Sequence, residues 1–538
     1  MRCLGRADPE IARNSTQQIL DRKGVVLMDP QLFRTKSIDQ LLADAERPEK
    51  KLKKSLGWLS LTALGIGAII GSGIFVLTGT AAAGEAVEFP SILKAPLLEV
   101  LMYGRHALGV NGRPGAGPAI ALSFFLVAVV CGLAGLCYAE LASMIPIAGS
   151  AYTYTYATLG ELIAWIIGWD LILEYAVSNM AVAVGFSAYI NSLLDSFGLH
   201  LPAVLSTPAY SPETGWALHF NIMGFVIVML LTVLLVVGIR ESSGANNIMV
   251  GIKLLAIVVF CIAASKYIHP TNWHPFAPNG FQGVLTGGAI VFFTYIGFDS
   301  VSTAAEECKD PKRDLPIGIL ISLFVCAFFY IAVALVLTGI QHWSTLDNAA
   351  PVAHALEAIG LNGVNRWVTA GALMGMISSI LVFQLGQARV WFAMSRDGLL
   401  PGAFSRVHKR FRTPDVATWV AGIVVAIPAG IFDIGTLADL SNIGTLFAFI
   451  LVSLAVLILR KKQPDRPRAF SVPWSPWIPI ASVVFCFVLM ASLTVENWIR
   501  FFVWLIIGLF VYQFYGRRNS TLGGHKLMPN AQEDRPVI

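Results

Sequence analysis

Apolar segments of about 20 residues, separated by polar segments, recur along almost the whole chain of 538 residues. An α-helix of that length crosses the hydrocarbon core of a bilayer. The pattern predicts an all-α polytopic membrane protein with about twelve transmembrane helices. They are expected at residues 58–80, 118–142, 161–190, 217–239, 246–268, 282–305, 316–340, 366–394, 415–433, 440–460, 474–494 and 496–515.

The two ends of the chain are polar and predict segments outside the membrane. Residues 1–54 are expected to form a cytoplasmic N-terminal arm, in which residues 37–46 have the pattern of a short amphipathic helix. Met28 is an alternative start, because no structural pattern precedes it. Residues 516–538 are expected to form a cytoplasmic C-terminal tail.

Two internal segments do not fit a simple alternation of spans and short loops. Residues 85–116 predict a long outer loop, whose middle part, 92–108, is expected to form a short interfacial helix. Residues 142–160 are uncharged and rich in tyrosine, and they predict a re-entrant or interfacial segment on the cytoplasmic side.

The composition agrees with a membrane protein, since 56% of the residues are hydrophobic and only 13% are charged. The formal net charge of +5 comes from lysines and arginines in short loops, and no long basic tract suggests a nucleic-acid partner. Because loops rich in Lys and Arg usually stay inside, their alternation over twelve spans predicts that both termini are cytoplasmic. The seven cysteines and nine histidines show no disulfide framework or metal-ligand spacing, so we expect no metal and no cofactor.

The first span contains glycines where a helix should be most regular. Gly65, Gly67, Gly71 and Gly73 lie close together, and each costs a helix interior roughly 1 kcal/mol relative to alanine. The helix is therefore expected to open at Gly71, Ser72 and Gly73. Freed backbone groups at membrane depth need protein or a water-filled cavity around them, which suggests a small polar ligand at this point.

The sixth span has a similar irregularity, because Gly297 and Asp299 interrupt its apolar sequence. Interrupted spans at the first and sixth positions indicate an inverted repeat of five plus five helices with a binding site near the middle of the membrane. The alternative is that the glycines only allow helices to pack closely.

An amino acid would suit such a pair of breaks. The N–H groups that begin a half-helix attract a carboxylate, and the carbonyls that end one attract an ammonium. We therefore expect Gly71, Ser72 and Gly73 to bind the carboxylate. Carbonyls near Phe293, Thr294 and Ile296 are expected to bind the amino group.

Lys253 lies roughly 10 Å inside the fifth predicted span at 1.5 Å per residue. A charge at that depth usually has a function, although the side chain could also extend to the cytoplasmic interface. In the functional interpretation its ammonium takes the place of a coupling cation and exchanges a proton during transport, so that sodium is not needed.

Other polar residues in the spans leave several roles open. Asp170 and Glu174 share one helix face and could bind a cationic substrate, relay protons or hydrogen-bond polar backbone. Ser378 and Ser379 are weaker candidates, because hydroxyls often bond within their own helix. Glu140 is expected to be solvated at a cytoplasmic helix end. No nucleophile elbow, phosphate loop or nucleotide motif is present, so an enzyme is not expected.

Several motifs resemble those of the amino acid-polyamine-organocation superfamily, and within it the bacterial relatives of the cationic amino acid transporters. These motifs are GIGAIIGSGIFVLTG, YAELASMIPIAGSAYTYTYATLGE, WIIGWDLILEYAV, GFDSVSTAAEECKDPKRDLPIGI and FAMSRDGLLP. The resemblance implies the leucine-transporter fold in a bacterial inner (plasma) membrane. Spans one to five and six to ten, within residues 55–460, would form the inverted repeats, and spans eleven and twelve, within 461–515, would lie outside this core. The loop 85–116 departs from the usual pattern, in which the first two spans are closely joined.

The resemblance also implies roles for individual residues. The substrate carboxylate would bind at Gly71, Ser72 and Gly73 with Ile70 beside them, and the amino group at the sixth-span break. Lys253 would stand in the place of a sodium ion. The sixth-span residues are Phe293, Thr294, Ile296 and Gly297, and Phe383 would lie near the pocket for the substrate side chain.

Together these features predict a secondary active transporter that imports an L-amino acid with a proton by alternating access. An amino acid exchanger without net proton flux and a transporter-like amino acid sensor are the alternatives. The sequence leaves open whether the substrate is cationic or neutral, and it leaves open the oligomeric state.

Overall fold

The computed structural model describes residues 34–45, 54, 56–86, 90–195, 197–211, 215–237, 242–408, 411 and 413–523. Met28, most of the predicted N-terminal arm and the tail beyond residue 523 lie outside the described residues. The helices are α2 Ile38–Ala45, α3 Trp58–Ile69, α4 Thr78–Ala83, α5 Leu97–Tyr103, α6 Ile120–Met144, α7 Ala151–Thr158, α8 Glu161–Asp195, α9 Ala203–Ser206, α10 Ile222–Val237, α11 Ser242–Ser265, α12 Gly280–Val291, α13 Ser300–Thr303, α14 Pro311–Ile340, α15 Pro351–Ala358, α16 Asn362–Arg396, α17 Asp415–Ile431, α18 Ile434–Lys462, α19 Trp477–Ala491, α20 Val495–Val511 and α21 Arg517–Asn519.

The chain is an all-α, multi-pass integral membrane protein. Among the described residues, eight helices are long and apolar enough to cross a membrane, or nine if the bent pair Trp58–Ile69 and Gly73–Ala83 is counted as one span. Three shorter apolar helices, α10, α17 and α19, coincide with the predicted fourth, ninth and eleventh spans. Each of the twelve predicted segments thus lies on a helix or a broken helix, while the count of twelve membrane crossings stays a prediction.

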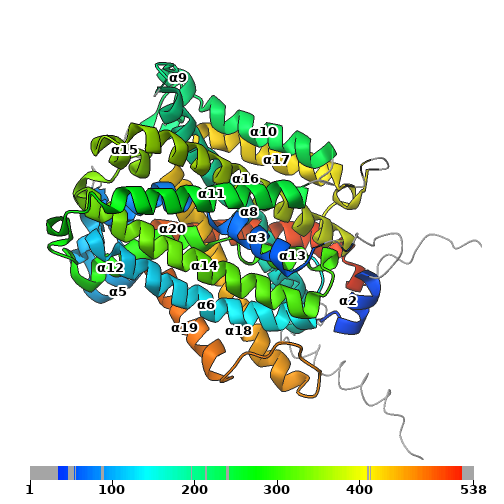
Figure 1. Cartoon of the computed structure of the whole chain (residues 1–538). Helices are drawn as coiled ribbons and strands as arrows, with labels where there is room; N and C mark the ends of the chain where they lie inside the picture. The colour runs from blue at the N-terminus through cyan, green and yellow to red at the C-terminus, as the bar shows by residue number, and fades with distance from the viewer. Residues whose placement is uncertain are drawn as a thin grey trace, which may run out of the picture.

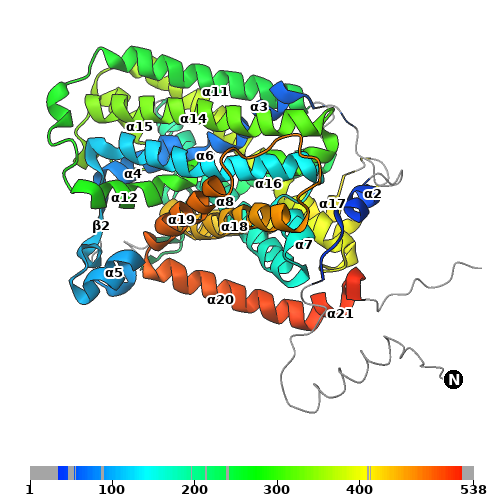
Figure 2. The same cartoon turned by 90° about the horizontal axis from the view of Figure 1, so that it is seen from below.

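The long helices run side by side in one bundle (Figures 1 and 2). Helix α8 packs against α16, α18, α10 and α17, while α14 packs against α6 and α3. The most apolar window of α8 is 83% buried and that of the sixth span 94% buried, whereas that of α20 is only 22% buried. The central helices can therefore hold polar groups away from lipid, and α20 lies at the edge of the bundle.

Helix α20 presents an apolar surface outward and a tryptophan stack inward. Phe502, Ile506 and Phe510 are exposed, as expected for side chains that contact lipid. On the inner side, the rings of Trp504 and Trp169 are stacked with their centroids 4.6 Å apart. The stack attaches this peripheral helix to α8.

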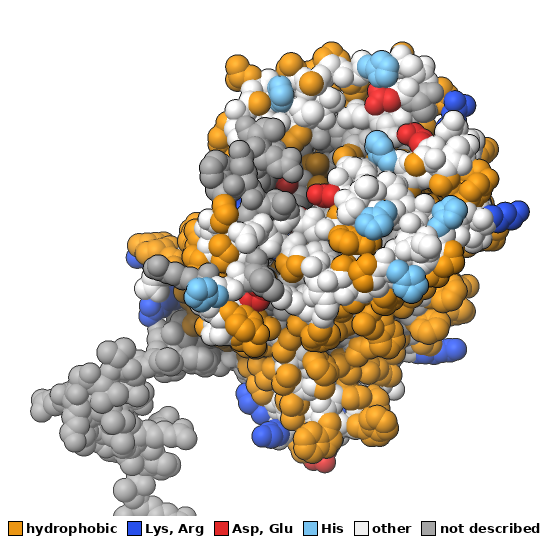
Figure 3. All heavy atoms as spheres, turned by 90° about the vertical axis from the view of Figure 1, so that its left-hand side faces the viewer, with side chains coloured by type: hydrophobic (Ala, Val, Ile, Leu, Met, Phe, Trp, Pro, Cys, Tyr) orange, Lys and Arg blue, Asp and Glu red, His pale blue; other side chains and the backbone are white. Residues whose placement is uncertain are grey.

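The loop predicted at residues 85–116 is folded onto one end of the bundle. Strand β1 Gly84–Ala86 pairs antiparallel with β2 Gly112–Pro114. The predicted helix over 92–108 is confirmed only in part, because Gly104 at φ +58° ends α5 and short 3-10 turns follow. Figure 3 looks onto this end, where histidine side chains and a few Asp and Glu side chains are scattered among uncharged ones.

An ion-pair cluster connects this loop to the bundle. Arg113 Nη2 lies 2.5 Å from Glu85 Oε2, and Arg113 Nη1 lies 2.9 Å from Asp439 Oδ1 on α18. Burial raises the pKa of Glu85, although the charge of Arg113 opposes that shift. The guanidinium therefore ties the end of the first span to the tenth predicted span.

The opposite end of the bundle contains the predicted re-entrant segment. It forms helix α7, whose three tyrosines, Tyr152, Tyr154 and Tyr156, are all buried. Tyr152 donates a hydrogen bond of 2.8 Å to Asp397, which also lies 3.2 Å from the ammonium of Lys36. The segment before α2 is thus packed against α7 and the end of α16.

The prediction that Glu140 is solvated is wrong. Its side chain is only 1% exposed and forms ion pairs with Arg460 and Arg468. The N–H of Val472 donates a further hydrogen bond of 2.7 Å to it. The chain after α18 folds back over the end of α6, which encloses the carboxylate in a set of charged partners.

Candidate functional site

The first span is interrupted where its glycines predict an opening. Helix α3 ends at Ile69, and the chain bends by 41° before helical structure resumes at Gly73. Ile70 has a non-helical conformation, at φ −81° and ψ 86°. Ser72 and Gly73 lie at the start of the second half-helix, where the first N–H groups have no acceptor within the helix. The N–H of Gly71 donates a hydrogen bond of 3.0 Å to the carbonyl oxygen of Ile69.

The second interruption lies in the sixth span. Helix α12 passes into the 3-10 turn η7 Phe292–Tyr295, and Ile296 then takes an extended conformation. Gly297 follows at φ +121°, a conformation that glycine adopts more easily than other residues. The backbone carbonyls at this point are therefore not all used by a regular helix.

The two interruptions are in contact. A Cβ atom on Gly73 would come within 2.7 Å of Thr294 Cγ2 and 3.0 Å of Thr294 Cα. A Cβ atom on Gly297 would lie 2.7 Å from the Cβ of Ala68. Glycine is needed at both positions because the two broken spans approach backbone to backbone.

Lys253 reaches the first interruption from α11. Its ammonium donates hydrogen bonds of 2.9 Å to the carbonyl oxygens of Gly67 and Ile70. The residue is completely buried, which excludes the alternative of a side chain extended to the interface. The lysine therefore satisfies carbonyls that the opening of the first span leaves free.

Ser379 on α16 completes this set of contacts. Its hydroxyl oxygen lies 2.7 Å from Gly67 O and 3.2 Å from both Ile70 O and Gly375 O, so its one proton can be donated to any of these carbonyls, with Gly67 O the nearest. The neighbouring Ser378 instead donates to Asn246 Oδ1 at 2.7 Å. Both serines thus connect α16 to other helices.

Tyr330 on α14 contacts both interruptions at once. Its hydroxyl lies 2.8 Å from the carbonyl oxygen of Ile69 and 2.7 Å from that of Thr294. The sequence did not single out this residue, because one tyrosine among the aromatic residues of an apolar span carries no distinctive pattern.

Phe383 on α16 forms an aromatic pair with Tyr175 near the sixth-span break. Its ring centroid is 6.3 Å from that of Tyr175 on α8. Tyr175 donates a hydrogen bond of 2.6 Å to Asp299, just beyond Gly297. Phe383 is thus connected to the second interruption through one residue, Tyr175.

Three carboxyl groups are buried on α8 and at the sixth-span break. Asp170, Glu174 and Asp299 are each at most 2% exposed. Within the described part of the chain, no oxygen of Asp170 or Glu174 has a hydrogen-bond partner, and Asp299 bonds through only one oxygen.

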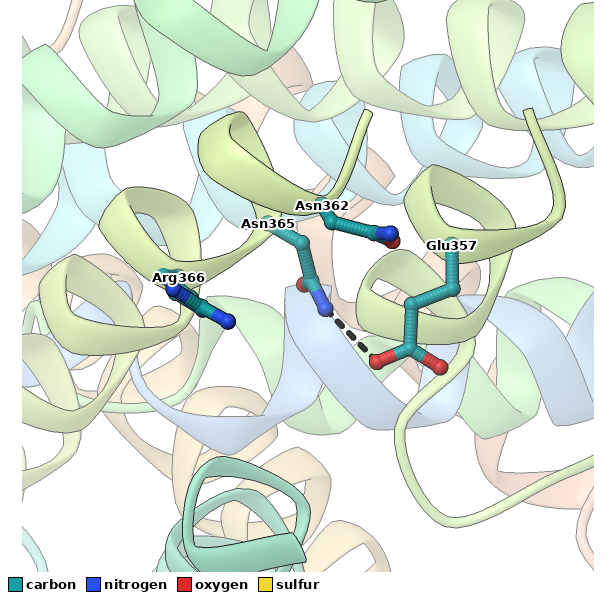
Figure 4. A pocket seen from close by; sticks show the side chains of 4 residues that line it. All are labelled: Glu357, Asn362, Asn365 and Arg366. Atoms are coloured by element: carbon teal, nitrogen blue, oxygen red, sulfur yellow. Dashed lines mark hydrogen bonds between the residues drawn. The ribbon is translucent and has the colours of Figure 1, made fainter. Parts of the chain in front are cut away.

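The contact region is closed to solvent. Ile70 and Ser72 are 0% exposed, and Thr294 and Ile296 are 1% exposed. A hollow of about 220 Å³ lies elsewhere, between α15 and the start of α16, and Figure 4 shows the four side chains that line it. They are Glu357, Asn362, Asn365 and Arg366.

The structure brings together most residues that the sequence proposed for the site. Gly71 packs against Ser379, since a Cβ atom there would come within 3.0 Å of its hydroxyl, and Ser72 packs against Gly185 of α8. Phe293 and Ile296 flank Thr294 at the second break.

A bundle of membrane helices with two interrupted spans in contact, and with a lysine on the carbonyls of one of them, is typical of secondary transporters. The chain belongs to the amino acid permease family, whose model matches residues 56–512.

Curated relatives agree with this assignment. The branched-chain amino acid permease BcaP of Bacillus subtilis is 47% identical over 498 residues, covering 92% of this chain and 100% of that protein. The methylthioribose transporter of the same species is 44% identical, with coverage of 91% and 99%. Cationic amino acid transporter 9 of Arabidopsis thaliana is 35% identical, with coverage of 81% and 72%.

Proposed function

We propose that the chain is a secondary active transporter that imports an L-amino acid together with a proton by alternating access. The observation that best supports this is the contact between the two broken spans at Gly73 and Thr294. A half-helix N-terminus and a half-helix C-terminus that meet offer opposite partial charges to the two ends of one zwitterion.

The carboxylate would bind the backbone N–H groups of Gly71, Ser72 and Gly73, with Ile70 beside them. The ammonium would bind carbonyls of Phe293, Thr294 and Ile296. Gly297 would permit the turn that exposes these carbonyls, and Phe383 would line the pocket for the substrate side chain.

The proton would bind at Lys253. Its ammonium already occupies the carbonyls of Gly67 and Ile70, which is a position suited to a coupling cation. Release of the proton would remove the charge that holds α11 against the first break. Binding and release would thereby be linked to movement of that span.

The architecture would be the leucine-transporter fold, with twelve spans in a bacterial plasma (inner) membrane and both termini cytoplasmic. Spans one to five and six to ten would be inverted repeats, with spans eleven and twelve outside them. The equivalent breaks in the first and sixth spans, five helices apart, support this arrangement.

The substrate would be a neutral, apolar amino acid. The relative named for branched-chain amino acids supports this choice, as do the apolar rings of Phe383 and Tyr175 beside the break. A cationic substrate is the second candidate, because the unpaired carboxyls of Asp170 and Glu174 lie buried nearby and relatives named for cationic amino acids exist. A carrier of methylthioribose would be inhibited by that compound rather than by L-leucine, and an exchanger would need a second amino acid on the other side of the membrane.

Uptake by proteoliposomes tests this function. Labelled L-leucine should accumulate when the interior is made alkaline, and the accumulation should stop with a protonophore and ignore a sodium gradient. Unlabelled L-leucine and L-valine should compete, whereas L-arginine and methylthioribose should compete weakly. Accumulation without a pH gradient, or only when a second amino acid is preloaded, would instead favour an exchanger.

A further inference from the structure

The loop 85–116 has an apolar face that the described part of the chain does not cover. Leu101, Met102 and Tyr103 follow one another at the end of α5 and are 73%, 63% and 57% exposed. Ile92 and Leu93, in the turn before α5, are exposed as well. Single exposed apolar side chains are common on any protein, whereas a group of neighbouring ones indicates a surface that contacts something apolar.

The polar groups of α5 face the protein. Glu99 is the one charged residue between positions 95 and 103, and it is buried. Its carboxylate accepts hydrogen bonds from Gly109 N, at 2.9 Å, and from Gln282 Nε2, at 2.5 Å. The exposed side of residues 95–103 therefore carries no charge, as expected for a segment that lies in a membrane interface.

Backbone hydrogen bonds join this loop to the turn between α19 and α20. The N–H of Leu97 donates to Leu493 O at 2.9 Å, and the N–H of Val495 donates to Ala95 O at 3.0 Å. Figure 2 shows α5 at the side of the bundle, next to the beginning of α20. The apolar face of the loop thus adjoins the outermost helix of the bundle.

The first turns of α20 have the surface of a helix that contacts lipid. Ile499 and Phe502 are both about half exposed, and they follow directly on the joined turn. Lys94 Nζ lies 2.7 Å from Glu496 Oε2 at the start of this helix. A lysine and a tyrosine, here Lys94 and Tyr103, are typical of the boundary between hydrocarbon and head groups.

The inner side of the loop is tied to the outer halves of both broken spans. In the first span, the N–H of Ala116 donates a hydrogen bond of 2.9 Å to Ala81 O on α4. In the sixth span, the hydroxyl of Thr286 on α12 donates one of 2.7 Å to Pro114 O. A contact made by the apolar face is therefore transmitted to α4 and α12.

We propose that the apolar face of residues 92–103 binds the outer leaflet of the bilayer, and that the loop anchors the outer halves of the two broken spans to the membrane. The inference rests on the proposed function for the side of the membrane, since this end faces outward when both termini are cytoplasmic. The occupant is lipid because the face adjoins the lipid-exposed surface of α20. A stable protein–protein interface would need roughly 20–30 residues on each side, many more than this face offers.

Spin-label accessibility in the full-length protein tests the contact with lipid. The background carries Cys3→Ala and Cys261→Ala, because the other five cysteines are 0% exposed and do not react. Met102→Cys, Phe502→Cys and His354→Cys are each labelled in vesicles of phosphatidylethanolamine and phosphatidylglycerol. Phe502 lies on the lipid-facing side of α20, and His354 is an exposed polar position on α15.

Two collision partners distinguish lipid from water, because oxygen concentrates in hydrocarbon and a nickel chelate stays in water. The label at 102 is expected to collide with oxygen about as often as the label at 502, and with the nickel chelate several-fold less often than the label at 354. Nickel collisions at 102 equal to those at 354 would overturn the proposal. Dipolar broadening between labels at 102 in two molecules would also overturn it, since a second copy of the chain would then cover the face.

A variant that combines Leu101→Ser, Met102→Ser and Tyr103→Ser tests the anchoring role. Its initial rate of L-leucine uptake is expected to fall several-fold, while its unfolding midpoint in detergent stays that of wild type, because these side chains point away from the protein. Leu218→Ser, at a position that is 97% exposed in another loop, should leave the rate unchanged. Equal rates in wild type and the combined variant would overturn the anchoring role. If wild type does not transport amino acids, the proposed function fails, and the collision data still decide the contact with lipid.

Discussion

A Lys253→Ala variant is expected to lose proton-driven accumulation of its amino acid. The substitution removes the ammonium that binds the carbonyls of Gly67 and Ile70 and leaves Ser379 as their remaining side-chain donor. Uptake in an alkaline-inside proteoliposome should fall about tenfold or more, to the level seen without a pH gradient, because buried carbonyls lose a charged donor. The measurement is initial uptake at several external pH values.

Two further variants separate coupling from folding. Lys266 lies just after the same helix and is exposed, so Lys266→Ala should retain the pH dependence of wild type. Arginine holds its proton at all physiological pH values, so Lys253→Arg should bind substrate without following the pH gradient. Persistence of the wild-type pH dependence in Lys253→Ala would show that the coupling proton binds elsewhere.

A Gly73→Val variant is expected to lose substrate binding while remaining inserted and folded. A Cβ atom at this position already comes within 2.7 Å of Thr294 Cγ2, and valine adds two methyl groups beyond it. Separating the breaks by overpacking costs about 1–3 kcal/mol, which corresponds to roughly a tenfold to hundredfold loss of affinity. Thermal-shift titration with L-leucine measures the loss, since a bound ligand raises apparent stability by mass action.

Gly132 on α6 gives the matched control. A Cβ atom there meets nothing within 4 Å, so Gly132→Val should preserve both the substrate-dependent shift and the affinity. An unchanged affinity in Gly73→Val would mean that the contact between the broken spans is not the binding site. Loss of binding in both variants would point to a general effect of valine in a membrane helix.

The positions of the breaks could be predicted from the sequence because glycine acts locally. Gly71 and Gly73 weaken the helix within their own turn, and Gly297 does so in the sixth span. Lys253 could be predicted for a related reason, since one charge in an apolar span is conspicuous and costly. In these cases the residue type alone indicates the structural or chemical role.

Partners from distant segments could not be predicted in this way. Tyr330 and Ser379 are ordinary residues of apolar helices until folding brings them to the carbonyls of α3. Glu140 was expected to be solvated because its partners, Arg460 and Arg468, are more than three hundred residues away in the chain. Hydrophobic periodicity specifies which segments are helices, and it contains no information about which helix faces meet.

The short helices show the same limit. The tyrosine-rich segment at 142–160 was predicted to be re-entrant or interfacial because it is uncharged and broken, and its helix α7 is buried among other elements, so the interfacial alternative is wrong. Its hydroxyls find partners such as Asp397 that lie far away in the sequence. Polarity by itself therefore did not distinguish a surface helix from a buried one with polar partners.

The most direct test of the central claim is an experimental structure of the protein with its transported amino acid bound. We expect density for the amino acid between the two breaks, with the carboxylate at the N–H groups of Ser72 and Gly73 and the ammonium at the carbonyls near Thr294. Density for the substrate at another place, with Gly73 and Thr294 still in contact as in the closed structure, would contradict it.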